Sequence, residues 1–171
     1  MKKELTRRSF LKLAGVGALA VAMSGSLTGC DVIDNLKDMD SVSAAIGDVK
    51  FMMSASVWVN NGSNGMSYQP TCEIRNNSKK AVTYGGSGSD CEVIITGVLT
   101  DKNGKEYPMT YAGEKGSAPA GEKYEVKDFK LVAADKELYM EGSKVVTTFT
   151  YKGKKAVFTE YYDGNITSKV E

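Results

Sequence analysis

The chain has 171 residues, which fits one folded domain of ordinary size together with short additional segments. Its 22 basic and 21 acidic residues give a formal net charge of +1. The first 29 residues hold five of the bases and one acid, so the remainder carries −3. That remainder therefore lacks the net basic charge typical of proteins that bind nucleic acid or an anionic membrane surface. The sequence has no histidine, which removes the commonest general base and the commonest metal ligand.

The first 29 residues have the layout of a secretory signal. A basic start is followed by an uncharged run over residues 13–29 that ends in small residues. This run is interrupted by glycines and is short for a membrane-spanning helix, which needs about 20 predominantly apolar residues. A cleaved signal is therefore favoured over a permanent anchor helix.

Residues 6–12 read TRRSFLK, and they resemble the motif of proteins exported by the twin-arginine route. The matching positions are Arg7, Arg8, Phe10, Leu11 and Lys12. In that family, export follows folding and often accompanies a cofactor loaded before export. We find no convincing cofactor site in this sequence, and no cofactor is expected.

The end of the signal resembles the lipobox of bacterial lipoproteins, formed here by Leu27, Thr28, Gly29 and Cys30. The resemblance implies that the Cys30 thiol receives diacylglycerol and becomes the new N-terminus. At least two acyl chains give stable membrane anchoring. The expected location is the outer face of the cytoplasmic membrane, with membrane lipid as the partner of the acylated N-terminus.

Residues 30–47 are expected to form a tether. The segment holds Asp31, Asp34, Asp38 and Asp40, and its spaced apolar residues allow a short amphipathic helix. The spacing of the aspartates does not match the twelve-residue calcium loop, so a solvated spacer is the better interpretation.

From residue 48 to residue 162, apolar and polar residues alternate in short runs separated by turn residues. We count about eight strands, which favours an all-β antiparallel sandwich, followed by a tail over residues 163–171. Pro70 predicts an edge strand or a bulge, because proline cannot donate to a ladder. A change of parity near Lys127 and Asp128 predicts a β-bulge there. Residues 133–142 receive no assignment.

Two stretches carry a second resemblance. They are EIRNNSKKAVTY, over residues 73–84, and APAGEKYEVKDFKL, over residues 118–131. Both are similar to the immunoglobulin-like (telokin-like) domains common in bacterial surface lipoproteins, which implies a sandwich over residues 48–162. No particular function follows, because this fold hosts many roles.

Cys72 and Cys91 both fall on the predicted inward face of their strands. In an exported protein such a pair usually closes, so a structural disulfide is the main expectation. Two unpaired core thiols are the first alternative, and a redox or metal pair is the second.

Nothing in the sequence marks a catalytic site. There is no phosphate loop and no nucleophile elbow, and a Ser-x-x-Lys match occurs only inside the signal. Soft-metal binding through cysteine and methionine is an alternative, as a Cu(I) carrier or an electron-transfer accessory. The methionines concerned are Met52, Met53, Met66, Met109 and Met140. A carboxylate-based hydrolase is a weaker alternative.

The remaining expectation is a non-enzymatic module that binds an extracytoplasmic protein, a glycan or a surface complex. Candidate contact residues are Trp58, Tyr161 and Tyr162, because exposed aromatic side chains often anchor interfaces. Trp58 has the parity of an outward side chain, although the tether has the length to cover it. The loops over residues 60–65, 85–90 and 112–122 are natural binding loops on a rigid scaffold.

Overall fold

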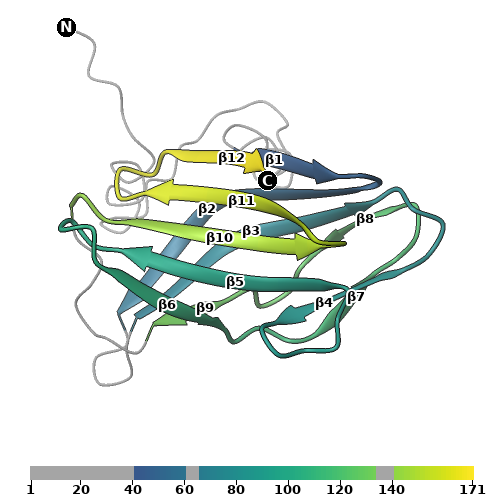
Figure 1. Cartoon of the computed structure of the whole chain (residues 1–171), viewed down its shortest axis with the longest axis horizontal. Helices are drawn as coiled ribbons and strands as arrows, with labels where there is room; N and C mark the ends of the chain where they lie inside the picture. Colours follow the sequence, from purple (N-terminus) through teal and green to yellow (C-terminus); the bar gives the residue numbers. More distant parts are fainter. Residues whose placement is uncertain (1–40, 61–65, 134–140) are drawn as a thin grey trace, which may run out of the picture. The chain divides into compact units, whose positions relative to one another are not determined.

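The computed structural model describes residues 41–60, 66–133 and 141–171, with the backbone alone over residues 55–60. These residues form twelve strands and no helix, which confirms the all-β expectation but exceeds the eight strands expected. Nine strands follow one another in the order β1-β2-β3-β9-β6-β5-β10-β11-β12. The ladders are antiparallel except for the pair of β4 and β5 (Figure 1). The segment from Asp40 to Glu171 is a compact unit in its own right.

One side of this unit is the β3 layer. It is built on the long antiparallel pair of β2 (Val49–Asn60) and β3 (Met66–Asn76). Strand β1 (Val42–Ile46) extends it beyond β2. On the far side of β3 lie β8 (Glu122–Glu125) and β9 (Leu131–Ala133), each paired with a different part of β3.

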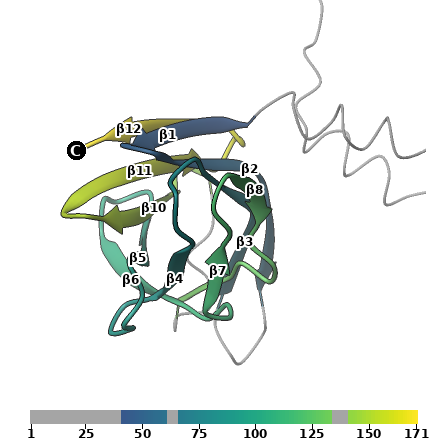
Figure 2. The ribbon, with the colours of Figure 1, turned by 90° about the vertical axis from the view of Figure 1, so that its right-hand side faces the viewer.

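The other side is the β10 layer, which lies in front in Figure 1 and is seen edge-on in Figure 2. Its centre is β10 (Lys144–Tyr151), which pairs with β5 (Val93–Thr100) and β11 (Lys154–Tyr161). Outside these lie β6 (Glu106–Tyr111) and β12 (Ile166–Val170). Strands β4 (Val82–Gly86) and β7 (Gly116–Ala118) continue this layer beside β5, and β9 joins it to the β3 layer through β6.

The two ends of the strand order come back together. Strands β1 and β12 are in contact, and the Ser168 hydroxyl donates to the Ser43 carbonyl at 2.9 Å. The sheet is therefore curled until it is nearly barrel-shaped, with side-chain contact in place of a backbone ladder at the seam (Figure 2).

The folded unit extends past both expected domain boundaries. Strand β1 lies within the expected tether of residues 30–47, and β12 lies within the expected tail of residues 163–171. Each has an inward-facing apolar side chain, Ile46 in β1 and the partly buried Ile166 in β12, packed on the core. Because both segments are only five residues long, their alternation is too brief to be recognised in the sequence.

The sequence predicted an edge strand or a bulge at Pro70. Pro70 lies in a central strand, and the irregularity is in the partner strand β2. Opposite Pro70, the register of β2 shifts between Ser54 and Ser56. On the other side of β3, the ladder with β8 reaches only to Glu73 and the ladder with β9 begins at Tyr68. Pro70 therefore lies between two partners, where a missing N–H costs no ladder bond.

The parity change near residue 128 comes from a break between strands, and the expected β-bulge is absent there. Strand β8 ends at Glu125, β9 begins at Leu131, and Asp128 between them has a φ of +53°. This left-handed residue turns the chain so that both Val126 and Phe129 are buried.

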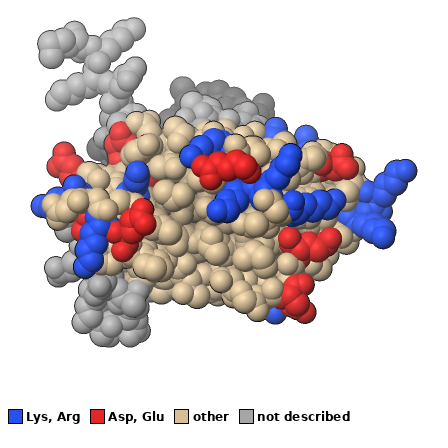
Figure 3. Space-filling model, in the orientation of Figure 1, with Lys and Arg blue, Asp and Glu red and all other residues tan. Residues whose placement is uncertain are grey.

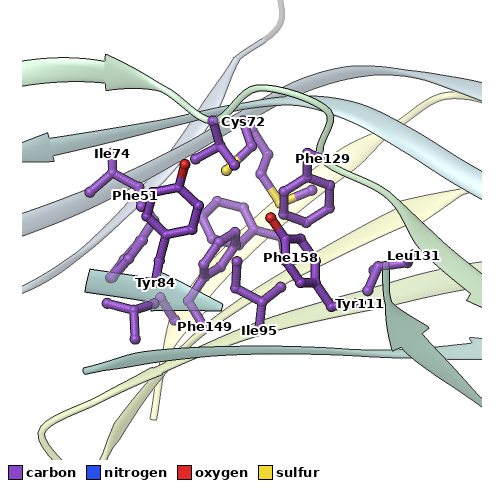
Figure 4. Close-up of a cluster of buried hydrophobic side chains, with 14 of the residues drawn as sticks. Phe51, Cys72, Ile74, Tyr84, Ile95, Tyr111, Phe129, Leu131, Phe149 and Phe158 are labelled. Atoms are coloured by element: carbon purple, nitrogen blue, oxygen red, sulfur yellow. The ribbon is translucent and has the colours of Figure 1, made fainter. Parts of the chain in front are cut away.

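The core is dominated by aromatic rings that meet across the two layers (Figure 4). Phe51 of β2 stacks on Phe149 of β10 with ring centroids 4.9 Å apart. Phe158 of β11 and Phe129 contact Phe149 at 5.5 and 6.1 Å. Such pairs contribute about 0.5–1.5 kcal/mol each beyond the area they bury. Among the described residues, the buried members of this core come from residues 44–158, inside the compact unit that begins at Asp40.

A polar contact crosses the same core. The Tyr68 hydroxyl of β3 donates to a Glu160 carboxylate oxygen of β11 at 2.7 Å, and both residues are buried. Burial raises the pKa of Tyr68 well above its usual value, and the Glu160 carboxylate raises it further. The phenol therefore stays protonated and available as a donor to Glu160.

We expect Tyr68→Phe to lower the free energy of unfolding by about 1–3 kcal/mol, because it removes a buried donor from a carboxylate. Urea unfolding followed by fluorescence measures the change. The matched control is Tyr161→Phe, at an exposed phenol, with an expected change within about 0.5 kcal/mol. Equal losses in the two variants would contradict a structural role for the contact.

Candidate interaction surface

The predicted contact residues are placed unequally by the structure. Tyr161, at the end of β11, is 43% exposed. Tyr162 is half-buried, and its backbone N–H donates to the Ser143 carbonyl at 2.9 Å. Trp58 has a described backbone in β2 opposite Tyr68, but its side chain lies outside the described residues. Only Tyr161 is thus shown as an accessible aromatic side chain.

The residues expected to direct export and anchoring lie outside the described part of the chain. They are Arg7, Arg8, Phe10, Leu11, Lys12, Leu27, Thr28, Gly29 and Cys30. Within the described ranges, no helix is long and apolar enough to cross a bilayer. Over the same ranges, no group of three or more acidic or cysteine side chains is arranged to hold a metal ion.

Cys72 and Cys91 are free thiols, so the expected disulfide is not formed in this structure. Cys72 faces inward from β3 and is fully buried. Cys91 lies before the first residue of β5, where its N–H donates to the Ser89 hydroxyl at 3.4 Å. The alternation of β5 therefore does not extend to residue 91, and the Cys91 thiol packs against Gly85 of β4.

The methionines considered as soft-metal ligands are mostly part of the core. Met53 lies directly opposite Cys72 in the register of β2 and β3, and both are buried. Met66 of β3 and Met109 of β6 are also buried, Met52 is partly exposed, and Met140 lies outside the described residues. Buried methionine of this kind ordinarily fills space between core side chains.

The outer face of the β10 layer carries a broad area without charge. Its central side chains are β-branched or proline, and cross-strand pairs such as Thr96 with Thr148 and Val98 with Val146 connect them. We name this area the threonine–valine face, formed by Ile94, Thr96, Val98, Pro108, Val146, Thr148, Thr150 and Thr159. Figure 3 shows it as the uncharged region over β5 and β10.

Charged residues border this face without entering it. Lys155 lies opposite Thr150 in register, and Lys144 lies opposite Thr100 with Glu106 beyond it. Tyr161 pairs with Lys144 and so belongs to the same border. An uncharged centre with a polar and charged border is the arrangement found at protein–protein contact surfaces.

The sequence analysis missed this face, although its residues are visible in the alternating runs. Threonine or valine occupies the outward positions 96 and 98 of β5 and 146, 148 and 150 of β10. Each run alone shows only good strand formers. The face becomes apparent once the pairing of β5 with β10 is known, because residues about 50 positions apart then become neighbours.

Comparisons with known proteins do not assign the chain to a family. No family model matches it, and no curated protein matches it. Among solved structures, one match is the X-ray structure of Northeast Structural Genomics Consortium target SoR45. That structure is 14% identical, with a TM-score of 0.39, over 74% of this chain and 84% of the other.

The thiols give a test of this part of the structure. In a chain that begins at residue 31, we expect a thiol reagent to label Cys91 in the native state and Cys72 only after unfolding. The reason is that Cys72 is fully buried and that burial raises the pKa of its thiol well above the usual value. Mass spectrometry counts the labels, with Cys91→Ser as the control. Labelling of both cysteines in the native protein would contradict the burial of Cys72. Labelling of neither cysteine until a reductant is added would contradict the free thiols.

Proposed function

We propose that the chain is an exported lipoprotein, anchored through Cys30 to the outer face of the cytoplasmic membrane. Its β domain then acts as a non-enzymatic module that binds another protein. The support for export and anchoring is the sequence TRRSFLK over residues 6–12 and the lipobox ending at Cys30. The twin-arginine route carries folded proteins in the family that this signal resembles, and a compact domain with a buried core suits that route.

The observation that carries the binding role is the threonine–valine face. Outward positions of a solvated antiparallel sheet are usually polar, whereas this area mixes isoleucine, valine and proline with threonine and holds no charge over three strands. Depletion of charge at the centre is the compositional feature that separates contact surfaces from the remaining surface. Tyr161 at the border adds an exposed aromatic side chain.

An immunoglobulin-like arrangement is part of the proposal. It is supported by two antiparallel layers that share one core, with β2 and β3 in one layer and β5, β10 and β11 in the other. The nearly barrel-shaped curl and the parallel pair of β4 and β5 are features that such a classification has to accommodate.

The anchor is tested by fractionating cells that express the full chain. We expect the unaltered protein in the membrane fraction and Cys30→Ala in the soluble fraction, because the acyl chains are lost with the thiol. The matched control is Cys91→Ala, which removes a cysteine of the folded domain and leaves the lipobox intact. Retention of Cys30→Ala in the membrane would exclude the lipid anchor.

The contact surface is tested by site-specific photocrosslinking in the same cells. A crosslinking amino acid at Thr148, at the centre of the threonine–valine face, is expected to give a discrete protein adduct. The matched position is Thr71, a half-buried threonine on the outer face of the β3 layer. The same adducts from both positions, or none from Thr148, would contradict this surface as the binding site.

A further inference from the structure

Three basic side chains form one row on the outer face of the β3 layer. Lys50 of β2 lies directly opposite Arg75 of β3, and Arg75 lies directly opposite Lys123 of β8. Directly opposed residues have Cβ atoms about 4.5–5.5 Å apart, and like charges at that spacing are destabilising. The row therefore concentrates positive charge at a cost to the fold.

This charge is offset in part on the same face, where Glu73 and Glu125 lie directly opposite each other, two positions along from Arg75 and Lys123. The Lys123 ammonium is 2.7 Å from a Glu73 carboxylate oxygen. Among the residues that the structure describes, no ion pair within 4.0 Å involves Lys50 or Arg75. Exposed Lys79 and Lys80 follow in the turn after β3. We name these five residues the cationic patch, made of Lys50, Arg75, Lys79, Lys80 and Lys123.

The patch belongs to the layer through which the chain enters the domain. Ala45 of β1 lies opposite Lys50 in register, and β1 begins at Val42. Eleven residues separate Cys30 from Val42, and an extended segment of that length spans at most about 40 Å. A protein anchored at Cys30 thus keeps the patch within reach of the lipid headgroups.

We propose that the cationic patch docks the domain on the anionic headgroups of the membrane in which Cys30 is anchored. This inference rests on the lipid anchor proposed above. Each basic residue near an anionic lipid surface adds about 1 kcal/mol of attraction, which supplements the acyl anchor and orients the domain. The net charge of the chain does not show this, because acidic residues elsewhere cancel the patch in the sum.

Docking in this way also sets the direction of the threonine–valine face. The patch lies on the outer face of the β3 layer, and the threonine–valine face lies on the outer face of the β10 layer. The two layers enclose one core between them (Figure 2). With the β3 layer on the membrane, the threonine–valine face points away from the bilayer, toward proteins outside it.

Vesicle cosedimentation of the unacylated chain from residue 31 tests the proposal. It compares phosphatidylcholine vesicles with vesicles containing about 30 mol% phosphatidylglycerol. We expect binding to the anionic vesicles alone, weakened when salt shortens the range of the attraction. The variant Lys50→Gln/Arg75→Gln is expected to bind roughly 25-fold more weakly, at about fivefold per cation.

The matched control is Lys102→Gln/Lys105→Gln, which removes the same charge from the exposed turn between β5 and β6 and should bind as the unaltered chain does. Circular dichroism and thermal unfolding verify that both variants fold. Equal weakening in the two variants, or binding to phosphatidylcholine alone, would overturn the proposal. Release by millimolar inorganic phosphate would also overturn it, because it indicates a discrete phosphate site.

The four aspartates of residues 31–40 are another anionic group within reach of the patch. If only a chain that begins at residue 41 bound anionic vesicles, the tether would be the occupant and the proposal would be wrong. Because Cys30 is absent from both chains, a negative result leaves the anchor itself untouched. The fractionation of Cys30→Ala tests the anchor separately.

Discussion

The stacking of Phe51 on Phe149 fixes the relation between the two layers of this domain. Once both rings point inward, the two-residue period of a strand determines the direction of the neighbours along β10 and along β2 up to its register shift after Ser54. Lys50 then has to point outward from one layer, and Thr148 has to point outward from the other. The uncharged face and the basic row therefore both follow from the Phe51–Phe149 contact, and they lie on opposite outer faces of the domain.

Much of this arrangement follows from local sequence patterns. The final hairpin is predicted by alternating residues on both sides of a short turn, and Lys152 and Gly153 adopt the positive φ values that such a turn requires. The inward set Val93, Ile95 and Leu99 is also evident from alternation. Alternation does not predict the positions of Cys91 and Asp128, because it assigns a face only while the strand continues. At Cys91, two residues before β5, and at Asp128, three residues after β8, the turn determines the direction of the side chain.

The surfaces are less accessible to prediction than the core, because they depend on which strands pair. Most large apolar residues are buried whatever the topology, so the alternation of apolar residues already indicates most of the core. Which surface feature an outward residue belongs to depends on the residues opposite it in the neighbouring strands. Arg75 is one basic residue among many in the sequence, and it becomes part of a row when β2 and β8 flank it. For the same reason a net charge near zero is compatible with a local row of basic residues.

The contact between β1 and β12 has a consequence for the order of assembly. These strands are the first and last of the described domain, and at their seam the Ser168 hydroxyl donates to the Ser43 backbone carbonyl. During synthesis β1 emerges long before β12 has been made. The seam therefore cannot close until both strands have left the ribosome. The curled sheet can therefore close only after β12 has been made, and a nascent chain that still lacks β12 leaves β1 without its contact at the seam.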